Sequence, residues 1–492
     1  FGRKRAIDQS ACNKDFSCLK GFCPALVTVE GGRLRRGKAL DLPLPDDDAG
    51  EPPPPALAAT AQPYGILITG VGGSGVVTLG ALIGMAAHLD GKGVTVLDMT
   101  GLAQKGGAVY SHVRICDDGA AIHAVRIATG EADAVIGGDI VVTAAGESLA
   151  KMQAGRSRVA VNCAETPTAE FVGHPDWQFP LRRMQDALRE AVGADGLHSF
   201  DAAAMATHLL GDALYANILL LGYAWQLGLI PVSAAALDRA IELNGAAVAM
   251  NRRAFHWGRR AAADPAAVAR LLPASASPPA TASLEEIIAR RQAFLTDYQD
   301  AAYAERYRAL VERVRAAEAP LKSTRLTEAV ARGYFKLLAA KDEYEVARLY
   351  AETDFLARVG EAFEGDYRLN FHLVPTLVAR PDPLTGRAAK RRFGPWLMAA
   401  FRLLARARRL RGGAWDVFRH TPERRLERQL LADYEADLAD LLPRLSPATL
   451  AAAVELASLP EQIRGFGPVK EKSAESLAPR RQALRAGLSS AA

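Results

Sequence analysis

The chain has 492 residues, a formal net charge of +5 and 49% hydrophobic residues. Its length predicts about three domains, and so small a charge on so long a chain excludes a nucleic-acid-binding protein with a concentrated basic face. The five cysteines are an odd number and no secretion signal is seen, so we expect a reducing, cytoplasmic compartment without a disulfide framework. Because Phe1 is not a usual first residue, we expect the chain to be a piece of a longer protein.

Three cysteines lie close together near the N-terminus and are followed by a proline: Cys12, Cys18, Cys23 and Pro24. In a reducing compartment this group indicates metal ligation, and thiolates suit an iron–sulfur cluster or zinc, each with a fourth ligand. The spacing is not a standard zinc or ferredoxin spacing, so three free thiols at a domain edge are the alternative. A short strand is predicted at Val27–Val29, and residues 33–63 form a proline-rich linker.

The stretch from Tyr64 to Asp98 predicts a strand, a glycine turn, a helix and a second strand. The turn has the pattern Gly-x-Gly-x-x-Gly and contains Gly70, Gly72, Gly73, Ser74 and Gly75. Glycines let the backbone approach a ligand closely, and a helix N-terminus presents free N–H groups and the positive end of the helix dipole. The turn therefore predicts an anion site. Because Asp98 ends the second strand, a dinucleotide site is the alternative.

A second glycine loop follows Asp98 and carries a lysine; it contains Gln104, Lys105, Gly106 and Gly107. In open α/β sheets, ligands bind outside the carboxyl ends of the strands, so we expect both loops to converge on one anionic group. A surface loop with a solvated lysine is the alternative. This loop is a poor fit to a plain dinucleotide site.

Residues 64–260 as a whole predict an α/β fold, an open Rossmann-like sheet covered by helices. Two short alternating runs, Ala108–Ile115 and Ala121–Ile127, predict a hairpin that turns at Asp117–Gly119. The apolar stretch Ala213–Val232 has the length of a membrane span, but its polar residues favour a buried helix. Further strands are predicted at Ala132–Ile136 and Arg158–Asn162, and further helices at Ala144–Ala154, Leu181–Val192, Asp201–Leu210 and Ala234–Asn251.

Residues 261–282 predict a second linker, and residues 283–492 predict a mainly helical domain with a small β-hairpin near Tyr367–Leu373. We expect this domain to serve in scaffolding or dimerisation. Its helices are predicted at Leu284–Leu295, Ala301–Ala317, Leu326–Leu338, Tyr344–Val359, Trp396–Arg411 and Thr421–Leu442.

A basic run in this domain places Arg402, Arg406 and Arg409 on one helix face. Such a face fits an acidic partner protein or a phosphate-bearing ligand, and a solvated helix face is the alternative. The histidines do not pair at metal spacing, so we expect each of them to be structural.

Several segments together resemble a known family. GVGGSGVVTLGALIGMAA, TGLAQKGGAVYSHVRI and ADAVIGGD, within residues 64–260, resemble the gamma domain of 2-oxoacid:ferredoxin oxidoreductases. Residues 1–32, with IDQSACNKDFSCLKGFCPALVTVEGG, resemble the end of the thiamine-diphosphate domain of the large fused indolepyruvate ferredoxin oxidoreductases. Residues 283–492 resemble the extra C-terminal domain of those proteins through KDEYEVARLY, FEGDYRLNFHL, FGPWLMAAFRLL and ELASLPEQIRGFG.

The resemblance implies oxidative decarboxylation of an aryl 2-oxoacid such as indolepyruvate to its acyl-CoA, with electrons passing through iron–sulfur clusters to ferredoxin. It implies Cys12, Cys18 and Cys23 as ligands of a [4Fe-4S] cluster. It also implies coenzyme A as co-substrate, and thiamine diphosphate with Mg²⁺ on an N-terminal part that this chain lacks. The chain alone is therefore expected to be inactive, and the catalytic residues are not among those assigned here.

On this resemblance, the glycine turn at Gly70–Gly75 lies beside the thiamine or coenzyme A site. Many relatives carry Arg-Gly-Gly where this chain has Lys105-Gly106-Gly107, and lysine keeps the charge but loses the bidentate fork. We expect a homo-oligomer that binds neither nucleic acid nor a membrane. A dinucleotide-binding regulatory or dehydrogenase module is the alternative function.

Overall fold

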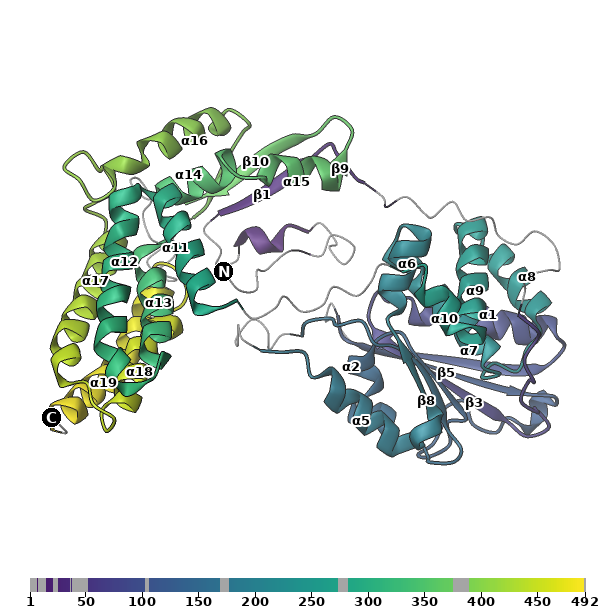
Figure 1. Ribbon diagram of the computed structural model, residues 1–492. Coiled ribbons are helices and arrows are strands. Elements are labelled where there is room, and N and C mark those ends of the chain that lie inside the picture. Colours follow the sequence, from purple (N-terminus) through teal and green to yellow (C-terminus); the bar gives the residue numbers. More distant parts are fainter. Residues whose placement is uncertain are drawn as a thin grey trace. The chain divides into compact units, whose positions relative to one another are not determined.

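A computed structural model describes residues 7, 15–20, 25–35, 37, 52–101, 106–168, 177–272, 282–374 and 389–490. The chain divides into two compact units, which we describe separately (Figure 1). Unit 1 combines Phe1–Arg35 with Ser277–Ala492, and unit 2 is Arg36–Ala276. Both breaks between the units fall within the stretches that the sequence predicts as linkers.

Unit 2 is built on a six-stranded sheet with the order β4-β5-β3-β6-β7-β8. Strands β3, β6, β7 and β8 pair in parallel, whereas β5 runs antiparallel between β4 and β3. The predicted Rossmann-like α/β fold is thereby confirmed. The strands are β3 (Tyr64–Val71), β4 (Gly93–Thr100), β5 (Ala108–Cys116), β6 (Ala134–Gly137), β7 (Arg158–Asn162) and β8 (Leu197–Phe200).

Helices cover both faces of this sheet (Figure 1). Ile66 and Ile68 of β3 belong to a core with α1 and α6 to α9, whereas Leu67 belongs to a second core with α2 and α5. This alternation follows from the two-residue period of a strand. The helices are α1 (Val76–Leu89), α2 (Ile140–Thr143), α3 (Gly146–Leu149), α5 (Leu181–Val192), α6 (Ala202–Leu210), α7 (Ala216–Gln226), α8 (Ala234–Asn244), α9 (Val248–Ala263) and α10 (Pro265–Ala269).

The predicted hairpin after β5 is wrong. Both edges of β5 are already paired, because Ser111 lies opposite Ile68 of β3 and opposite Asp98 of β4. A strand at 121–127 therefore has no free edge of β5 to join. The chain instead forms a short 3₁₀ helix, η2 (Gly119–Ala121), whose first N–H groups are capped by Asp118.

Two predicted long helices are shorter in the structure. The stretch 213–232 contains the 3₁₀ helix η4 (Ala213–Tyr215) and α7, and the chain leaves α7 through Gly228 at φ +75°. The stretch 234–251 divides at Gly245, which ends α8 in the left-handed conformation that glycine favours. Both helices remain buried, as the apolar sequence predicts.

Part of the predicted first linker lies along unit 2. The carbonyl of Pro53 accepts a hydrogen bond from Gln226 Nε2 at 2.7 Å, and that of Pro52 accepts one from Arg259 at 2.9 Å. Thr60 donates to Asp117 at 2.5 Å. These contacts fix residues 52–60 on the surface of the unit, in place of a free tether.

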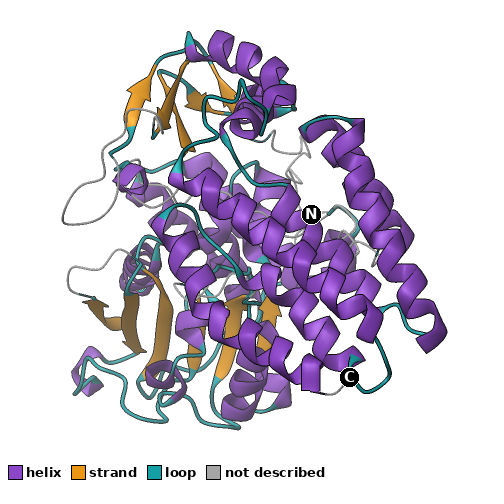
Figure 2. Cartoon of the chain, turned by 90° about the vertical axis from the view of Figure 1, so that its left-hand side faces the viewer, coloured by secondary structure: helices purple, strands orange, loops and turns teal. Residues whose placement is uncertain are grey.

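Unit 1 is mainly helical, and Figure 2 shows its helices with a small sheet at one end. The one helix predicted at 344–359 is divided between α14 and α15. The helices are α11 (Leu284–Tyr298), α12 (Ala301–Glu318), α13 (Arg325–Leu338), α14 (Glu343–Ala351), α15 (Phe355–Ala362), α16 (Leu397–Arg406), α17 (Pro422–Leu441), α18 (Leu450–Ser458) and α19 (Pro468–Ser490). Short 3₁₀ helices are η1 (Ser17–Lys20), η3 (Ala194–Gly196, in unit 2), η5 (Ala319–Leu321), η6 (Ala407–Leu410), η7 (Leu442–Arg444) and η8 (Leu459–Gln462).

The sheet of unit 1 joins segments that are far apart in the sequence. Strand β1 (Ala25–Glu30) pairs antiparallel with β10 (Arg368–Leu373), which also pairs with β11 (Arg391–Phe393). A second pair links β2 (Arg33–Leu34) to β9 (Phe363–Glu364). The antiparallel β10–β11 pair confirms the predicted hairpin, and its predicted turn at 382–386 lies outside the described residues.

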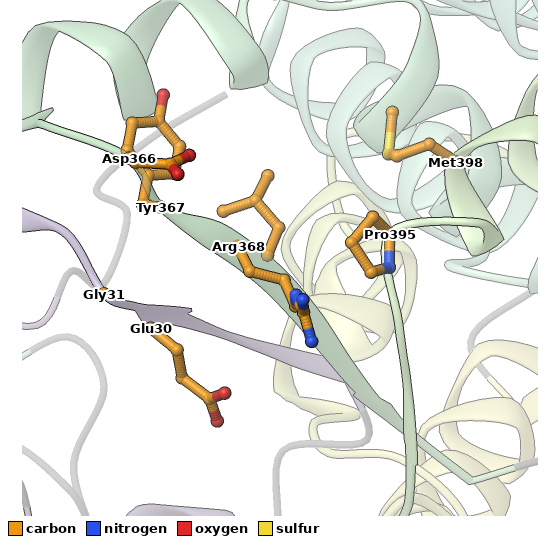
Figure 3. A pocket seen from close by; sticks show the side chains of 8 residues that line it. Glu30, Gly31, Asp366, Tyr367, Arg368, Pro395 and Met398 are labelled. Atoms are coloured by element: carbon orange, nitrogen blue, oxygen red, sulfur yellow. The ribbon is translucent and has the colours of Figure 1, made fainter.

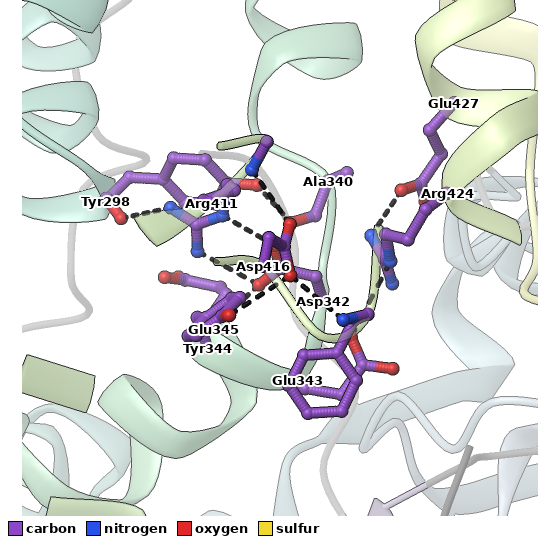
Figure 4. Close-up of polar contacts among 12 residues, drawn as sticks. Tyr298, Ala340, Asp342, Glu343, Tyr344, Glu345, Arg411, Asp416, Arg424 and Glu427 are labelled. Carbon is purple, nitrogen blue, oxygen red and sulfur yellow. Dashed lines mark hydrogen bonds and ion pairs between the residues drawn. The ribbon is translucent and has the colours of Figure 1, made fainter. Parts of the chain in front are cut away.

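A buried ionic group holds the centre of unit 1 together (Figure 4). The guanidinium of Arg411 donates to both oxygens of Asp342, at 2.5 and 2.9 Å, and lies 3.6 Å from the ring centre of Tyr298. Asp342 also caps α14 by accepting from the N–H of Glu345 at 2.8 Å. Nearby, Arg424 pairs with Glu427. Arg411, which the sequence places in a basic run, is thus an internal structural residue.

Candidate anion-binding site

A hollow of about 450 Å³ opens where β3 and β4 end and α1 begins. Its walls combine glycine backbone with a few small side chains. The lining residues are Val71, Gly72, Gly73, Gly75, Val76, Val77, Thr78, Thr100, Gly101, Gly107 and Val109. The hollow therefore lies outside the carboxyl ends of strands, where open α/β sheets bind ligands.

The turn at 70–75 requires its glycines for different reasons. Gly73 and Gly75 have φ angles of +98° and +82°, which side chains strain. At Gly70, a Cβ atom would lie 2.5 Å from Ser74 Oγ, and at Gly75 it would lie 2.1 Å from Asn217 Nδ2. Gly73 faces open space, because no atom lies within 4 Å of a Cβ built there.

Asp139 fixes this turn from the neighbouring strand. It follows β6 and accepts from the N–H of Val71 at 2.5 Å through Oδ2, while its Oδ1 caps α2 by accepting from Val142 at 2.9 Å. Burial raises the pKa of Asp139, and the hydrogen bonds from Val142 and Val71 oppose that shift. Sequence reasoning missed this residue, although a polar residue after a buried strand and two glycines was an available signal.

The second glycine loop meets the first. The N–H of Gly72 donates to the carbonyl of Gly107 at 2.8 Å, and Gly101 and Gly107 both line the hollow. Gly106 adopts a left-handed φ of +75° where the chain returns to β5. Gln104 and Lys105 lie outside the described residues. The structure thus brings the described parts of the two loops together, as the sheet topology predicts.

The electrostatics of the hollow favour an anion. The N-cap of α1 is Gly75, so no side chain satisfies the first N–H groups of the helix, and its first turn contains no acidic residue. The positive end of the helix dipole therefore faces the hollow, along with N–H groups that can donate. Among the described lining residues none is acidic, and Thr78 and Thr100 add hydroxyl groups. This arrangement can bind a phosphate or carboxylate.

Two residues singled out in the sequence lie away from the hollow. Ser74 Oγ is buried against the turn and has no hydrogen-bond partner among the described atoms. Asp98 is exposed on β4, with Oδ1 3.5 Å from a Cβ built at Gly80, in the second turn of α1. A dinucleotide site needs an acidic residue beside the glycine turn to bind the ribose. The position of Asp98 therefore disfavours the dinucleotide alternative.

Of the three clustered cysteines, the structure describes Cys18, which lies in η1 as an exposed free thiol. Cys12 and Cys23 lie outside the described residues. Within the described part of the chain, no group of three or more His, Cys, Asp or Glu side chains is placed to hold a metal ion. Burial raises the pKa of the Cys163 thiol to about 11, which makes it an unreactive, structural cysteine.

Unit 1 contains a larger hollow, of about 610 Å³, beside the start of β10 (Figure 3). Figure 3 shows side chains of both charges around it, including Glu30, Asp366 and Arg368. Glu30 is already paired with Arg392 at 2.7 Å. Sequence reasoning missed this hollow, because residues from β1 and β10 meet there only after folding. Its mixed charges favour no single class of ligand.

Comparison with known proteins identifies the family. Residues 65–261 match the family model described as pyruvate ferredoxin/flavodoxin oxidoreductase. The indolepyruvate oxidoreductase subunit IorB of Methanothermobacter thermautotrophicus is 30% identical over 204 residues, which cover 41% of this chain and 98% of that protein. The chain belongs to the pyruvate ferredoxin/flavodoxin oxidoreductase family. The IorB subunit of Pyrococcus horikoshii is similar too, at 29% identity over 41% of this chain and 96% of that protein.

Other comparisons extend this result. Residues 284–483 match a family of unknown function, DUF6537. Among solved structures, the gamma subunit of a keto/oxoacid ferredoxin oxidoreductase from Geobacter sulfurreducens is 24% identical, with a TM-score of 0.28, over 40% of this chain and 98% of that one. No helix in the described ranges is both long and apolar enough to cross a membrane.

Proposed function

We propose that this chain is part of an enzyme that oxidatively decarboxylates an aryl 2-oxoacid of the indolepyruvate type. In this reaction the bond between the carboxylate and the keto carbon breaks and carbon dioxide leaves. The acyl group forms a thioester with coenzyme A, and two electrons pass singly to ferredoxin. Membership of the family and the similarity to IorB subunits support this proposal.

Within this reaction, we assign the hollow at the glycine turn to a phosphate of coenzyme A. The observation that carries the assignment is the uncapped N-terminus of α1, which opens into a hollow without a described acidic residue. Backbone groups of Gly72, Gly73 and Gly75 would face the phosphate, with Gln104, Lys105, Gly106 and Gly107 closing the site from the second loop. Coenzyme A supplies the thiol that accepts the acyl group.

The other cofactors are assigned more broadly. Cys12, Cys18 and Cys23 are proposed as ligands of a [4Fe-4S] cluster, because exposed thiols in one short segment suit electron transfer. Thiamine diphosphate with Mg²⁺ would be bound by a part of the enzyme outside these residues. We further propose that the enzyme is cytoplasmic and oligomeric.

The function is tested with the complete enzyme, purified without oxygen. Indolepyruvate, coenzyme A and the electron acceptor methyl viologen are expected to give viologen reduction that depends on coenzyme A, together with bound iron and acid-labile sulfide. A Cys12/Cys18/Cys23→Ser variant should lose about one cluster's iron. Absence of coenzyme A-dependent reduction with aryl and aliphatic 2-oxoacids alike would overturn the proposal, and reduction of a nicotinamide would favour the dinucleotide alternative.

A further inference from the structure

The segment 389–415 of unit 1 carries an unusual concentration of positive charge. It contains no Asp or Glu and has these basic residues: Lys390, Arg391, Arg392, Arg402, Arg406, Arg408, Arg409 and Arg411. Carboxylates from elsewhere neutralise some of them: Glu30 pairs with Arg392, Glu352 with Arg408 and Asp342 with Arg411. The remaining charges therefore need a separate explanation.

Three of these arginines form an exposed stripe. Arg402, Arg406 and Arg409 lie at spacings of four and three residues along α16 and η6, so they share one side of the helix. All three are exposed, and no ion pair joins them to a carboxylate in the part of the chain that the structure describes. Their charge is available to a partner.

An apolar side chain lies among these charges. Leu403 is 72% exposed, next to Arg402 and one turn from Arg406. The opposite side of α16 is already buried, because Leu397, Phe401 and Ala405 pack in the core with Phe371 and Ala347. Leu403 is therefore not needed for folding. Arginines around an exposed apolar residue are typical of protein-binding surfaces, in which charged groups steer the partner and apolar groups are desolvated.

We propose that this arginine face, defined as Arg402, Leu403, Arg406 and Arg409, docks the acidic electron-carrier protein that receives the electrons. The inference rests on the proposed function. Its partner is assigned by charge complementarity, because an acidic protein is attracted to unpaired arginines and its association is accelerated. The proposal also gives a role to residues 284–483, whose family has no known function.

The same unit holds the cysteine-bearing segment. Lys390 Nζ donates to the carbonyl of Leu19, the residue after Cys18, at 2.6 Å, and β1 is paired with β10 along six residues. Strand β11 then leads through Trp396, 63% exposed, into α16. Electrons that leave through the cysteine segment would thus leave from the body that carries the arginine face.

Other partners fit this face less well. A membrane would require α16 to insert an apolar side, and that side is buried in the core. Nucleic-acid interfaces are polar and strongly charged, with contacts that follow the phosphates, whereas a leucine lies at the centre of this face. A protein with acidic groups around an apolar patch complements it best.

The test compares two variants of the complete enzyme that change charge by the same amount. Arg402→Glu/Arg406→Glu alters the arginine face, and Arg308→Glu/Arg313→Glu alters exposed arginines on α12 of the same unit. Both are assayed with indolepyruvate and coenzyme A, using either an acidic bacterial ferredoxin or methyl viologen as acceptor, at low and high salt.

We expect the arginine-face variant to raise the KM for ferredoxin about tenfold or more at low salt, with less difference at high salt. Turnover with methyl viologen should stay unchanged, and the α12 variant should behave as the unaltered enzyme. An unchanged KM for ferredoxin with full viologen turnover would overturn the docking proposal, as would an equal effect of both variants. Loss of viologen turnover in the unaltered enzyme would instead overturn the proposed function.

Discussion

The backbone N–H of Val71 donates to the carboxylate of Asp139 at 2.5 Å, which ties the glycine turn at the end of β3 to the start of α2. The other carboxylate oxygen caps α2 through Val142 at 2.9 Å. One side chain thus satisfies backbone groups of two elements, and both groups are shielded from water.

Replacing Asp139 by alanine is expected to destabilise unit 2 by about 2–4 kcal/mol, because two N–H groups lose a charged acceptor. Asp201→Ala is the matched control: it removes an exposed N-cap, from Ala204 at 2.8 Å, and should cost only about 1 kcal/mol. Calorimetry of the full chain measures both shifts. Equal losses for the two variants would show that Asp139 acts as a helix cap alone.

Thr78 allows the anion site to be tested without damage to the fold. Its exposed side chain lies in the first turn of α1 and lines the hollow. In Thr78→Glu, the carboxylate should stabilise the helix by about 0.3–1 kcal/mol through the dipole, yet repel a phosphate. We expect coenzyme A to bind at least about tenfold more weakly by calorimetric titration, with an unchanged or higher melting temperature.

Thr78→Gln provides the control for this change, because it has nearly the same size as glutamate and no charge. It should retain most of the affinity for coenzyme A. If glutamine weakens binding as much as glutamate does, the effect comes from filling the hollow, and the electrostatic part of the assignment is wrong.

Sequence reasoning succeeded where the information was local. Helix α5 has the bounds Leu181–Val192 that its periodicity predicts, and the strand, turn and helix around Gly70–Gly75 are confirmed. These elements depend on the spacing of apolar residues and on glycines with few conformational alternatives. The convergence of Gly72 and Gly107 also followed, because parallel strands end at the same edge of a sheet.

The features that sequence reasoning missed depend on distant segments. Strand β1 pairs with β10, where Val27 lies opposite Phe371, and nothing in either segment specifies the other. The strand β8 is four residues long and too short for its period to be recognised. Asp139 was missed because its partner, Val71, is a backbone group without a sequence signature. Each of these features is set by tertiary packing and not by local propensity.

Helices α7 and α9 cross at two glycines, which gives a strong prediction for stability. A Cβ at Gly258 would lie 1.9 Å from the carbonyl oxygen of Leu219, and one at Gly222 would lie 2.0 Å from that of Phe255. Gly258→Ala must therefore push the helices apart and should cost about 3 kcal/mol or more.

The control for Gly258→Ala is Gly146→Ala, because Gly146 begins α3 and a Cβ at this position would meet no atom within 4 Å. That change should be neutral or stabilise the unit by a few tenths of a kcal/mol. Thermal unfolding of the full chain distinguishes the two. A small shift for Gly258→Ala would show that the crossing adjusts easily.

His112 is expected to make unit 2 sensitive to acid. The side chain is 2% exposed in β5, and its Nδ1 accepts from the N–H of Ile127 at 3.2 Å. Burial, and then the charge of Arg126, lower the pKa of His112 to about 4, so the folded unit holds it neutral. The unfolded chain binds a proton below about pH 6.5. Stability is therefore complete above that pH and falls as the pH drops toward 4, by up to about 1 kcal/mol per pH unit.

The measurement is urea unfolding of the full chain between about pH 7 and 4.5, compared with a His112→Gln variant. Glutamine does not titrate in this range, so the fall should be less steep in the variant. Parallel pH curves for the two proteins would show that another group causes the acid sensitivity.

The pair Arg411 and Asp342 is expected to be important for unit 1 because both members are buried. The side chain of Asp342 is 3% exposed and that of Arg411 is 11% exposed. Asp342→Ala leaves the guanidinium without its carboxylate and removes the cap of α14, at an expected cost of about 3–5 kcal/mol. Asp354→Ala breaks an ion pair with Arg358 at 2.7 Å whose members are 59% and 74% exposed, and should cost less than about 1 kcal/mol. Thermal unfolding of both variants decides whether burial sets the difference: similar costs would mean that water reaches Arg411, and the buried pair would then contribute no more than a surface one.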